Sequence, residues 1–120
     1  MLSITKRFEF ETAHFLPDYK GKCALIHGHS FKLEIEISKC PSSYKNYSSF
    51  IMDFGDLKKI VNECIIEQLD HKFLNDMFEI PTCETLVLWI QKKLFLIFQE
   101  GLERIRLYET SNSYAEWKKK

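Results

Sequence analysis

The sequence predicts an α+β domain in the order β-β-α-α-β-β, with a four-stranded antiparallel sheet and two helices on one of its faces. Two observations carry this prediction. Near both ends of the chain, apolar and polar residues alternate, which is typical of half-buried strands. Between residues 56 and 101, apolar residues instead recur every three or four positions, which is typical of amphipathic helices.

The first two strands are expected over residues 4–14 and 29–37. In the first, aromatic side chains share one parity with His14, and charged side chains take the other. In the second, His29 shares a face with alternate apolar residues. Residues 15–28 contain proline and glycine and predict a loop. This loop is longer than the about 2–5 residues of a usual hairpin connection, and long loops in compact domains are often functional.

Two helices are expected next. The first begins at Asp56, whose carboxylate is a suitable N-cap, and fades near Leu69. The second begins after Pro81, with Thr82 as its N-cap, and ends at Gly101. Its apolar side chains extend beyond one stripe, which indicates a surface that faces a partner subunit. The predicted core stripe is Leu86, Trp89, Ile90, Leu94 and Ile97.

The last two strands are expected over residues 103–109 and 114–117, joined by a turn at residues 111–113. Four strands leave two open edges, and natural proteins usually cover such edges. Edge-to-edge assembly of several copies into a closed barrel would remove them. We therefore expect a homo-oligomer.

The composition bounds the function. The chain has 120 residues, which suits a single domain over residues 1–120. Its 17 basic and 17 acidic residues give a net charge of zero, so a nucleic-acid or membrane partner is not expected. No apolar run approaches the about 18–20 residues of a membrane helix, and the N-terminus does not resemble a signal peptide. These features predict a cytoplasmic protein whose four cysteines are free thiols.

Three of the four histidines are expected to converge. His27 and His29 are two residues apart, so they point the same way on an extended chain. His14 ends the first predicted strand, beside the start of the second. Three imidazoles without a fourth protein ligand are typical of catalytic zinc, although imidazole also suits iron, copper and nickel. The alternative is that backbone groups satisfy three unrelated histidines.

Four further residues have functional side chains in suggestive positions. Cys23 lies four residues before His27, where a nearby cation would favour its thiolate; the alternative is an inert thiol. Asp70 and His71 are adjacent and form either an oriented acid–base pair or a polar helix end. Glu109 continues an apolar strand face, where a carboxylate needs a partner. That partner is either a ligand's N–H groups or a salt bridge.

Six segments in order resemble motifs of the pterin synthase family built on the tunnelling fold, or T-fold, known as the 6-pyruvoyl-tetrahydropterin synthase family. They are Phe10–His14, Cys23–His29, Asp53–Lys58, Leu69–Asn75, Pro81–Glu84 and Tyr108–Thr110. The resemblance covers nearly the whole chain. It implies a T-fold whose strands join between subunits into a barrel, in a trimer or hexamer.

The resemblance also implies residue roles. His14, His27 and His29 would bind Zn²⁺; Cys23, Asp70, His71 and Glu109 would be catalytic; Thr82, Cys83, Glu84 and Glu109 would bind substrate.

The spacing of three residues between Cys23 and His27 resembles that of the 6-carboxytetrahydropterin synthases of queuosine (7-deazaguanine) biosynthesis. These lyases convert 7,8-dihydroneopterin triphosphate to 6-carboxytetrahydropterin, acetaldehyde and triphosphate. The alternatives are the pyruvoyl-forming synthases, which act on the same substrate, and a non-catalytic zinc- or pterin-binding module.

Overall fold

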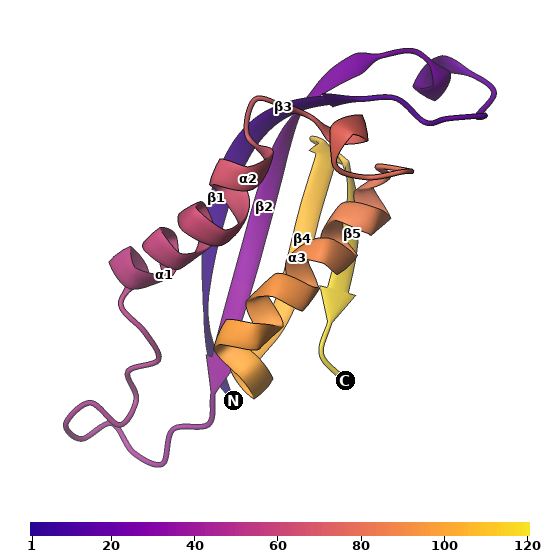
Figure 1. The fold of residues 1–120 in the computed structure, drawn as a ribbon. Helices are drawn as coiled ribbons and strands as arrows, with labels where there is room; N and C mark the ends of the chain where they lie inside the picture. The colour runs from indigo at the N-terminus through magenta and orange to yellow at the C-terminus, as the bar shows by residue number, and fades with distance from the viewer.

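The computed structural model describes residues 1–120, and its strands form one sheet in the order β3-β1-β2-β4-β5 (Figure 1). Four strands are antiparallel to their neighbours, as predicted: β1 (Leu2–His14), β2 (His27–Lys39), β4 (Leu102–Thr110) and β5 (Ser113–Lys118). The fifth strand, β3 (Lys72–Phe73), was not predicted. It pairs in parallel with Thr12 and Ala13 of β1, so the sheet is mixed. Two residues are too few to show a period in the sequence.

The helices pack on one face of the sheet, as predicted (Figure 1). The first helical segment runs without a break through α1 (Phe54–Val61), a π-helical turn η2 (Asn62–Ile66) and α2 (Glu67–Leu69). A 3₁₀ turn, η3 (Leu74–Asp76), precedes the second helix, α3 (Cys83–Phe98). Between sheet and helices lies one cluster of 19 buried apolar residues. No helix has the length and apolar character needed to cross a membrane.

The N-cap of the first helix differs from the prediction. Asp53, not Asp56, caps α1: its carboxylate accepts from the backbone N–H of Gly55 at 2.6 Å and of Asp56 at 3.3 Å. The helix therefore begins earlier, and Asp56 lies in its first turn, where a negative charge favours the helix dipole. Thr82 caps α3 as predicted, because its Oγ1 accepts from the Thr85 N–H at 3.1 Å.

The predicted core stripe of α3 is correct except at its end. Leu86, Ile90 and Leu94 are buried, but Ile97 is 45% exposed. A spacing of four residues continues the stripe to Phe98, which packs against the core instead. The last turn, η4 (Gln99–Gly101), then leads into β4, so helical structure ends at Gly101 as predicted.

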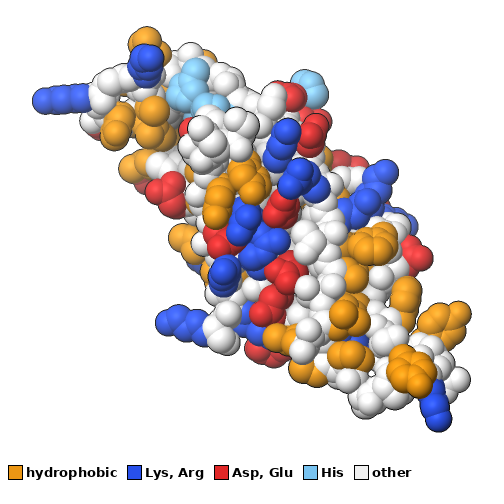
Figure 2. Space-filling model, turned by 180° about the vertical axis from the view of Figure 1, so that it is seen from behind, with side chains coloured by type: hydrophobic (Ala, Val, Ile, Leu, Met, Phe, Trp, Pro, Cys, Tyr) orange, Lys and Arg blue, Asp and Glu red, His pale blue; other side chains and the backbone are white.

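The sheet face without helices is charged. Figure 2 shows basic and acidic side chains mixed across the middle of this face. Arg104 lies within 3.4 Å of carboxylate oxygens from three strand residues, Glu34, Glu36 and Glu116. Arg7 also pairs with Glu34. The hairpin of β1 and β2 extends past the helices, and its loop of residues 15–26 contains a 3₁₀ turn, η1 (Lys22–Ala24) (Figure 1).

Candidate active site

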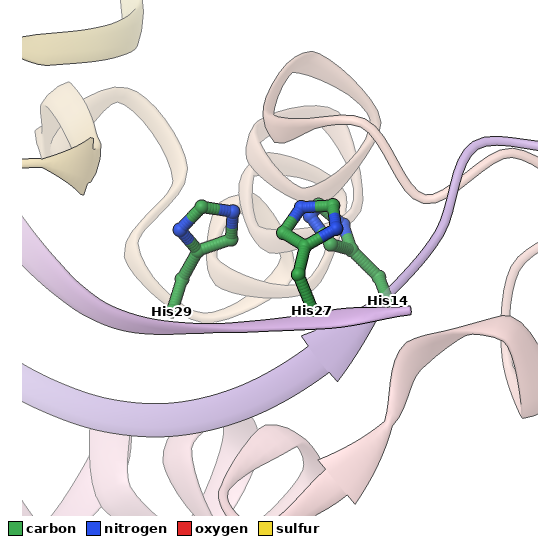
Figure 3. Close-up of side chains that lie close together, drawn as sticks. All are labelled: His14, His27 and His29. Carbon is green, nitrogen blue, oxygen red and sulfur yellow. The ribbon is translucent and has the colours of Figure 1, made fainter. Parts of the chain in front are cut away.

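Three imidazoles gather where β1 ends and β2 begins. His14 is the last residue of β1 and pairs in register with His27, the first residue of β2. His29 follows two residues later, on the same side of the strand. The ring atoms that could ligate a metal all lie within 4.8 Å of one another (Figure 3). The predicted convergence of His14, His27 and His29 is therefore present in the structure.

Backbone carbonyls fix the orientation of two of these rings. His14 Nδ1 lies 2.7 Å from the carbonyl oxygen of Pro81, and His27 Nδ1 lies 2.7 Å from that of Leu25. Because a carbonyl only accepts, each Nδ1 carries a proton, and Nε2 is the ring nitrogen left to bind a metal. This arrangement is typical of histidines that bind a metal through Nε2.

His29 has no such backbone partner. Its Nε2 lies 3.3 Å from Oε1 of Glu109, close enough for attraction but without hydrogen-bond geometry. Burial lowers the pKa of His29, and the neighbouring His14 and His27 lower it further against the opposing effect of Glu109. The neutral form, which a metal ligand requires, is therefore favoured.

The donor set fits a zinc ion. The Nε2 atoms of His14 and His29 are buried without a hydrogen-bond partner, which is costly unless something else binds them. Three imidazoles match the ligand number of catalytic zinc, which keeps a position for water or substrate. A cation at this point would contact both orphaned nitrogens.

A cavity of about 460 Å³ adjoins the histidines through Glu109. It is lined by Cys83 and Glu84 at the start of α3, by Glu109 at the end of β4, and by the first four residues of β5. The predicted substrate-binding residues Cys83, Glu84 and Glu109 are thus together. Thr82 is not among the lining residues; its hydroxyl caps α3 instead.

The thiol of Cys83 is a neutral group of this cavity wall. It is buried and its Sγ donates to the carbonyl oxygen of Leu107 at 3.3 Å. Burial raises the pKa of Cys83 to about 12. At neutral pH this thiol can shape the cavity and donate a weak hydrogen bond, but it is a poor nucleophile.

Cys23 lies in η1, in the loop that joins β1 to β2. Its side chain is half-buried. Its carbonyl oxygen accepts from the N–H of Leu16 at 2.7 Å, which ties the two sides of the loop together. Cys23 therefore belongs to the segment that carries His27, but no hydrogen bond joins its thiol to a histidine.

Asp70 and His71 are fastened to β1 through Glu11. The Asp70 carboxylate accepts from the Glu11 N–H at 2.9 Å, and this bond lowers the pKa of Asp70. Oδ1 of Asp70 also lies 3.1 Å from His71 Nδ1, so the carboxylate orients that ring. The His71 N–H donates to the Glu11 carbonyl at 2.6 Å, which holds His71 at a φ of 59°. A left-handed backbone costs about 1–2 kcal/mol outside glycine.

The imidazole of His71 is directed to solvent. Its side chain is 80% exposed and borders an open hollow of about 550 Å³ that His29 also lines. No ion pair or hydrogen bond connects Asp70 or His71 to Cys23 within the chain. Within the chain, Glu109 joins the metal site to one cavity, and His71 of the acid–base pair borders a second hollow, which His29 also lines.

Three contributors to this site were not predicted. They are the carbonyls of Leu25 and Pro81, which orient histidine rings, and Asn75, whose carboxamide bonds to the backbone of Phe15. Any residue type offers a carbonyl, so its use depends on loop paths that a sequence pattern does not specify. Asn75 lies inside the Leu69–Asn75 motif, which was the available signal.

Comparison with known proteins adds a family and a fold. Residues 3–120 match the family model of 6-pyruvoyl tetrahydropterin synthase. The chain is 37% identical over 120 residues to the 6-carboxy-5,6,7,8-tetrahydropterin synthase of Synechocystis, covering 98% of this chain and 93% of the relative. It is 32% identical over 139 residues to the enzyme of that name from Haemophilus influenzae, covering 98% and 99%.

The chain is also similar to a relative with a different enzyme name and to a solved structure. The 6-pyruvoyl tetrahydrobiopterin synthase of Dictyostelium discoideum is 30% identical over 130 residues, covering 96% of this chain and 94% of the relative. The structure of the Caenorhabditis elegans 6-pyruvoyl tetrahydropterin synthase superposes with a TM-score of 0.82 at 20% identity, covering 99% and 96% of the two chains. At that identity the likeness concerns the fold, which is the T-fold that the sequence motifs implied.

Proposed function

This chain belongs to the 6-pyruvoyl tetrahydropterin synthase family, and we propose that it is a zinc-dependent 6-carboxytetrahydropterin synthase. In the proposed reaction, 7,8-dihydroneopterin triphosphate and one water give 6-carboxy-5,6,7,8-tetrahydropterin, acetaldehyde and triphosphate. The bond between the first two side-chain carbons breaks. The ring gains the two electrons that the three side-chain carbons together lose, so no external reductant is required. The product would enter the queuosine pathway.

One observation carries this proposal: the three-histidine cluster adjoins a cavity whose wall contains three carboxylates, those of Glu84, Glu109 and Glu116. Glu109 reaches 3.3 Å from His29 and also lines the cavity with Glu84. A pterin carries an amidine-like N–H edge, which a carboxylate binds through two parallel hydrogen bonds. With that edge on Glu109, the ring would lie in the cavity beside the histidine cluster.

The roles of the chain's residues follow from this orientation. Zinc held by His14, His27 and His29 would polarise the side-chain hydroxyls as a Lewis acid. Cys23 would take protons from the side-chain carbons and return them. His71, oriented by Asp70, would be the second acid and base. Glu109 would hold the ring, and Glu84 and Cys83 would complete the wall.

The cysteine spacing and two of the relatives favour the carboxy-forming reaction over the pyruvoyl-forming one. Three residues separate Cys23 from His27, and this spacing resembles that of the carboxy-forming synthases. The relatives from Synechocystis and Haemophilus influenzae bear that name. The Dictyostelium relative keeps the pyruvoyl-forming reaction as the second candidate. A non-catalytic zinc or pterin module is the third, and it would not require Cys23.

The test is to incubate the zinc-loaded protein with 7,8-dihydroneopterin triphosphate and to identify the released pterin by mass. We expect 6-carboxytetrahydropterin together with acetaldehyde. A pyruvoyl-substituted product would overturn the proposal in favour of the second candidate. Cys23→Ala should keep its zinc and lose turnover, whereas Cys40→Ala, at an exposed cysteine outside the site, should match the wild type. Unchanged turnover in Cys23→Ala would remove Cys23 from the mechanism.

A further inference from the structure

The segment between α2 and α3 is bound to the end of β1 at several successive points. Asp70 accepts from the backbone of Glu11, and the hydroxyl of Thr12 donates to the carbonyl of Lys72 at 2.5 Å. Further along, the carbonyl of Pro81 accepts from the ring of His14. Together with the pairing of β3 with β1, these contacts hold residues 70–81 beside the end of β1, along the site.

Asn75 adds a contact just past the end of β1, and it does so with both ends of its carboxamide. Its Oδ1 accepts from the N–H of Phe15 at 2.9 Å, and its Nδ2 donates to the carbonyl of the same residue at 3.0 Å. A neighbouring strand would bind a residue in the same way. The side chain therefore replaces a strand partner at the first residue beyond β1 and fixes the backbone there.

Phe15 is the point at which the two halves of the site join. It directly follows His14, which is the buried member of the histidine cluster. It directly precedes Leu16, whose N–H donates to the carbonyl of Cys23 at 2.7 Å. Phe73 stacks on the Phe15 ring with centroids 6.0 Å apart. One fixed residue thus sets the position of a predicted metal ligand and the base of the loop that carries the predicted catalytic thiol.

We propose that Asn75 is a positioning residue that holds His14 and the Cys23 loop in a fixed relation through its two hydrogen bonds to Phe15. The proposal rests on the function proposed above and adds to it the device that assembles the site. Asn75 touches no reacting atom. Its loss frees the backbone between His14 and Leu16, so the cluster no longer presents three preorganised nitrogens, and the thiol no longer has one position.

The test uses Asn75→Ala and, as its matched control, Asn62→Ala. Asn62 lies in η2 and its side chain makes no hydrogen bond to another residue. The first readout is zinc affinity by competition with a chromogenic chelator. Removal of a group that supports a metal ligand typically weakens the affinity about 10- to 100-fold. We expect a loss of that size in Asn75→Ala, a broadened absorption spectrum with Co²⁺, and no change in Asn62→Ala.

The second readout is kinetic and concerns the thiol. Because the Glu109 cavity does not contact Asn75, we expect kcat to fall about 10-fold or more while KM stays within about 2-fold. The alkylation rate of Cys23 in the metal-free protein should also change, whereas that of Cys40 should not. Unaltered zinc affinity, Co²⁺ spectrum and Cys23 alkylation, together with a lower melting temperature, would show a purely structural role and overturn the proposal.

Two arrangements keep this test decisive. Asn75→Asp retains the acceptor for the Phe15 N–H and places a carboxylate oxygen against the Phe15 carbonyl in place of the donor. It is expected to weaken zinc binding and change Cys23 alkylation as Asn75→Ala does; if Asn75→Ala does not fold, Asn75→Asp decides. If the wild type binds zinc but releases no pterin product, the proposed function fails, while zinc affinity and Cys23 alkylation still decide the role of Asn75.

Discussion

At the scale of single residues, the two nitrogens of each imidazole have different functions. In His14 and His27, Nδ1 donates to a backbone carbonyl, and Nε2 is left available to bind a metal. The sequence predicted which histidines would meet, because a spacing of two places His27 and His29 on one side of a strand. It did not predict the carbonyls of Leu25 and Pro81, because main-chain acceptors are present at every position.

A metal-binding prediction belongs to this scale. His27→Ala removes one of three ligands, so we expect it to weaken zinc binding more than the about 10- to 100-fold that loss of an outer partner causes. Elemental analysis after dialysis should find most of the zinc gone. His71→Ala is the matched control, because its ring is exposed and lies outside the cluster. Full zinc occupancy in His27→Ala would contradict the ligand assignment.

At the scale of elements, periodicity predicted the long strands and helices well. It predicted the exact start of a helix and the shortest strand poorly. The four main strands and both helices lie where the alternation and the helical spacing indicated. The cap at Asp53 was missed because a second aspartate, Asp56, lies closer to the first apolar stripe residue. β3 was missed because its partner, β1, is about 60 residues away in the chain and its two residues form no pattern.

The hydrophobic periodicity also did not predict the ion pairs on the charged sheet face. These ion pairs lead to a prediction about the pH dependence of stability. Burial alone would raise the pKa of Glu34, but hydrogen bonds and charge from Arg7 and Arg104 outweigh it and lower the pKa below its ordinary value of 4.5. A lowered carboxyl pKa stabilises the fold above the unfolded-state value, and this stability is lost as pH falls through the folded-state value. The lowered pKa values of Glu36 and Glu116 act in the same direction.

We therefore expect the free energy of unfolding to fall as the pH is taken below about 4.5, and part of this fall to disappear in Glu34→Gln. At pH 7 the same variant should lose about 1–3 kcal/mol, because two arginines lose a charged partner. Urea unfolding at a series of pH values measures both effects. Glu9→Gln is the control, since Glu9 is exposed and lies 3.9 Å from Lys32. A pH profile for Glu34→Gln that parallels the wild type would refute this account.

At the scale of the whole molecule, the single chain has an incomplete surface. Its extents are 56 × 26 × 25 Å, and its radius of gyration of 16.0 Å exceeds the about 14 Å of a compact chain of this length. β5 has no strand on its outer side, and β3 covers only Thr12 and Ala13 of β1. Two open sheet edges and a projecting apolar loop are features that assembly would cover.

This surface predicts that several copies associate through the sheet edges and the projecting loop. Leu25 and Ile26 at the loop are 71% and 69% exposed, and a net charge of zero does not oppose contact between copies. Sedimentation equilibrium should give a multiple of the 14.3 kDa chain mass, with a trimer or hexamer expected. Replacing both residues by serine should shift the population toward the single chain, because water-exposed apolar area would no longer be buried on association. Tyr44→Ser, at an 88% exposed side chain outside that loop, should sediment like the wild type. A wild-type mass of one chain across the concentration range would rule out the assembly.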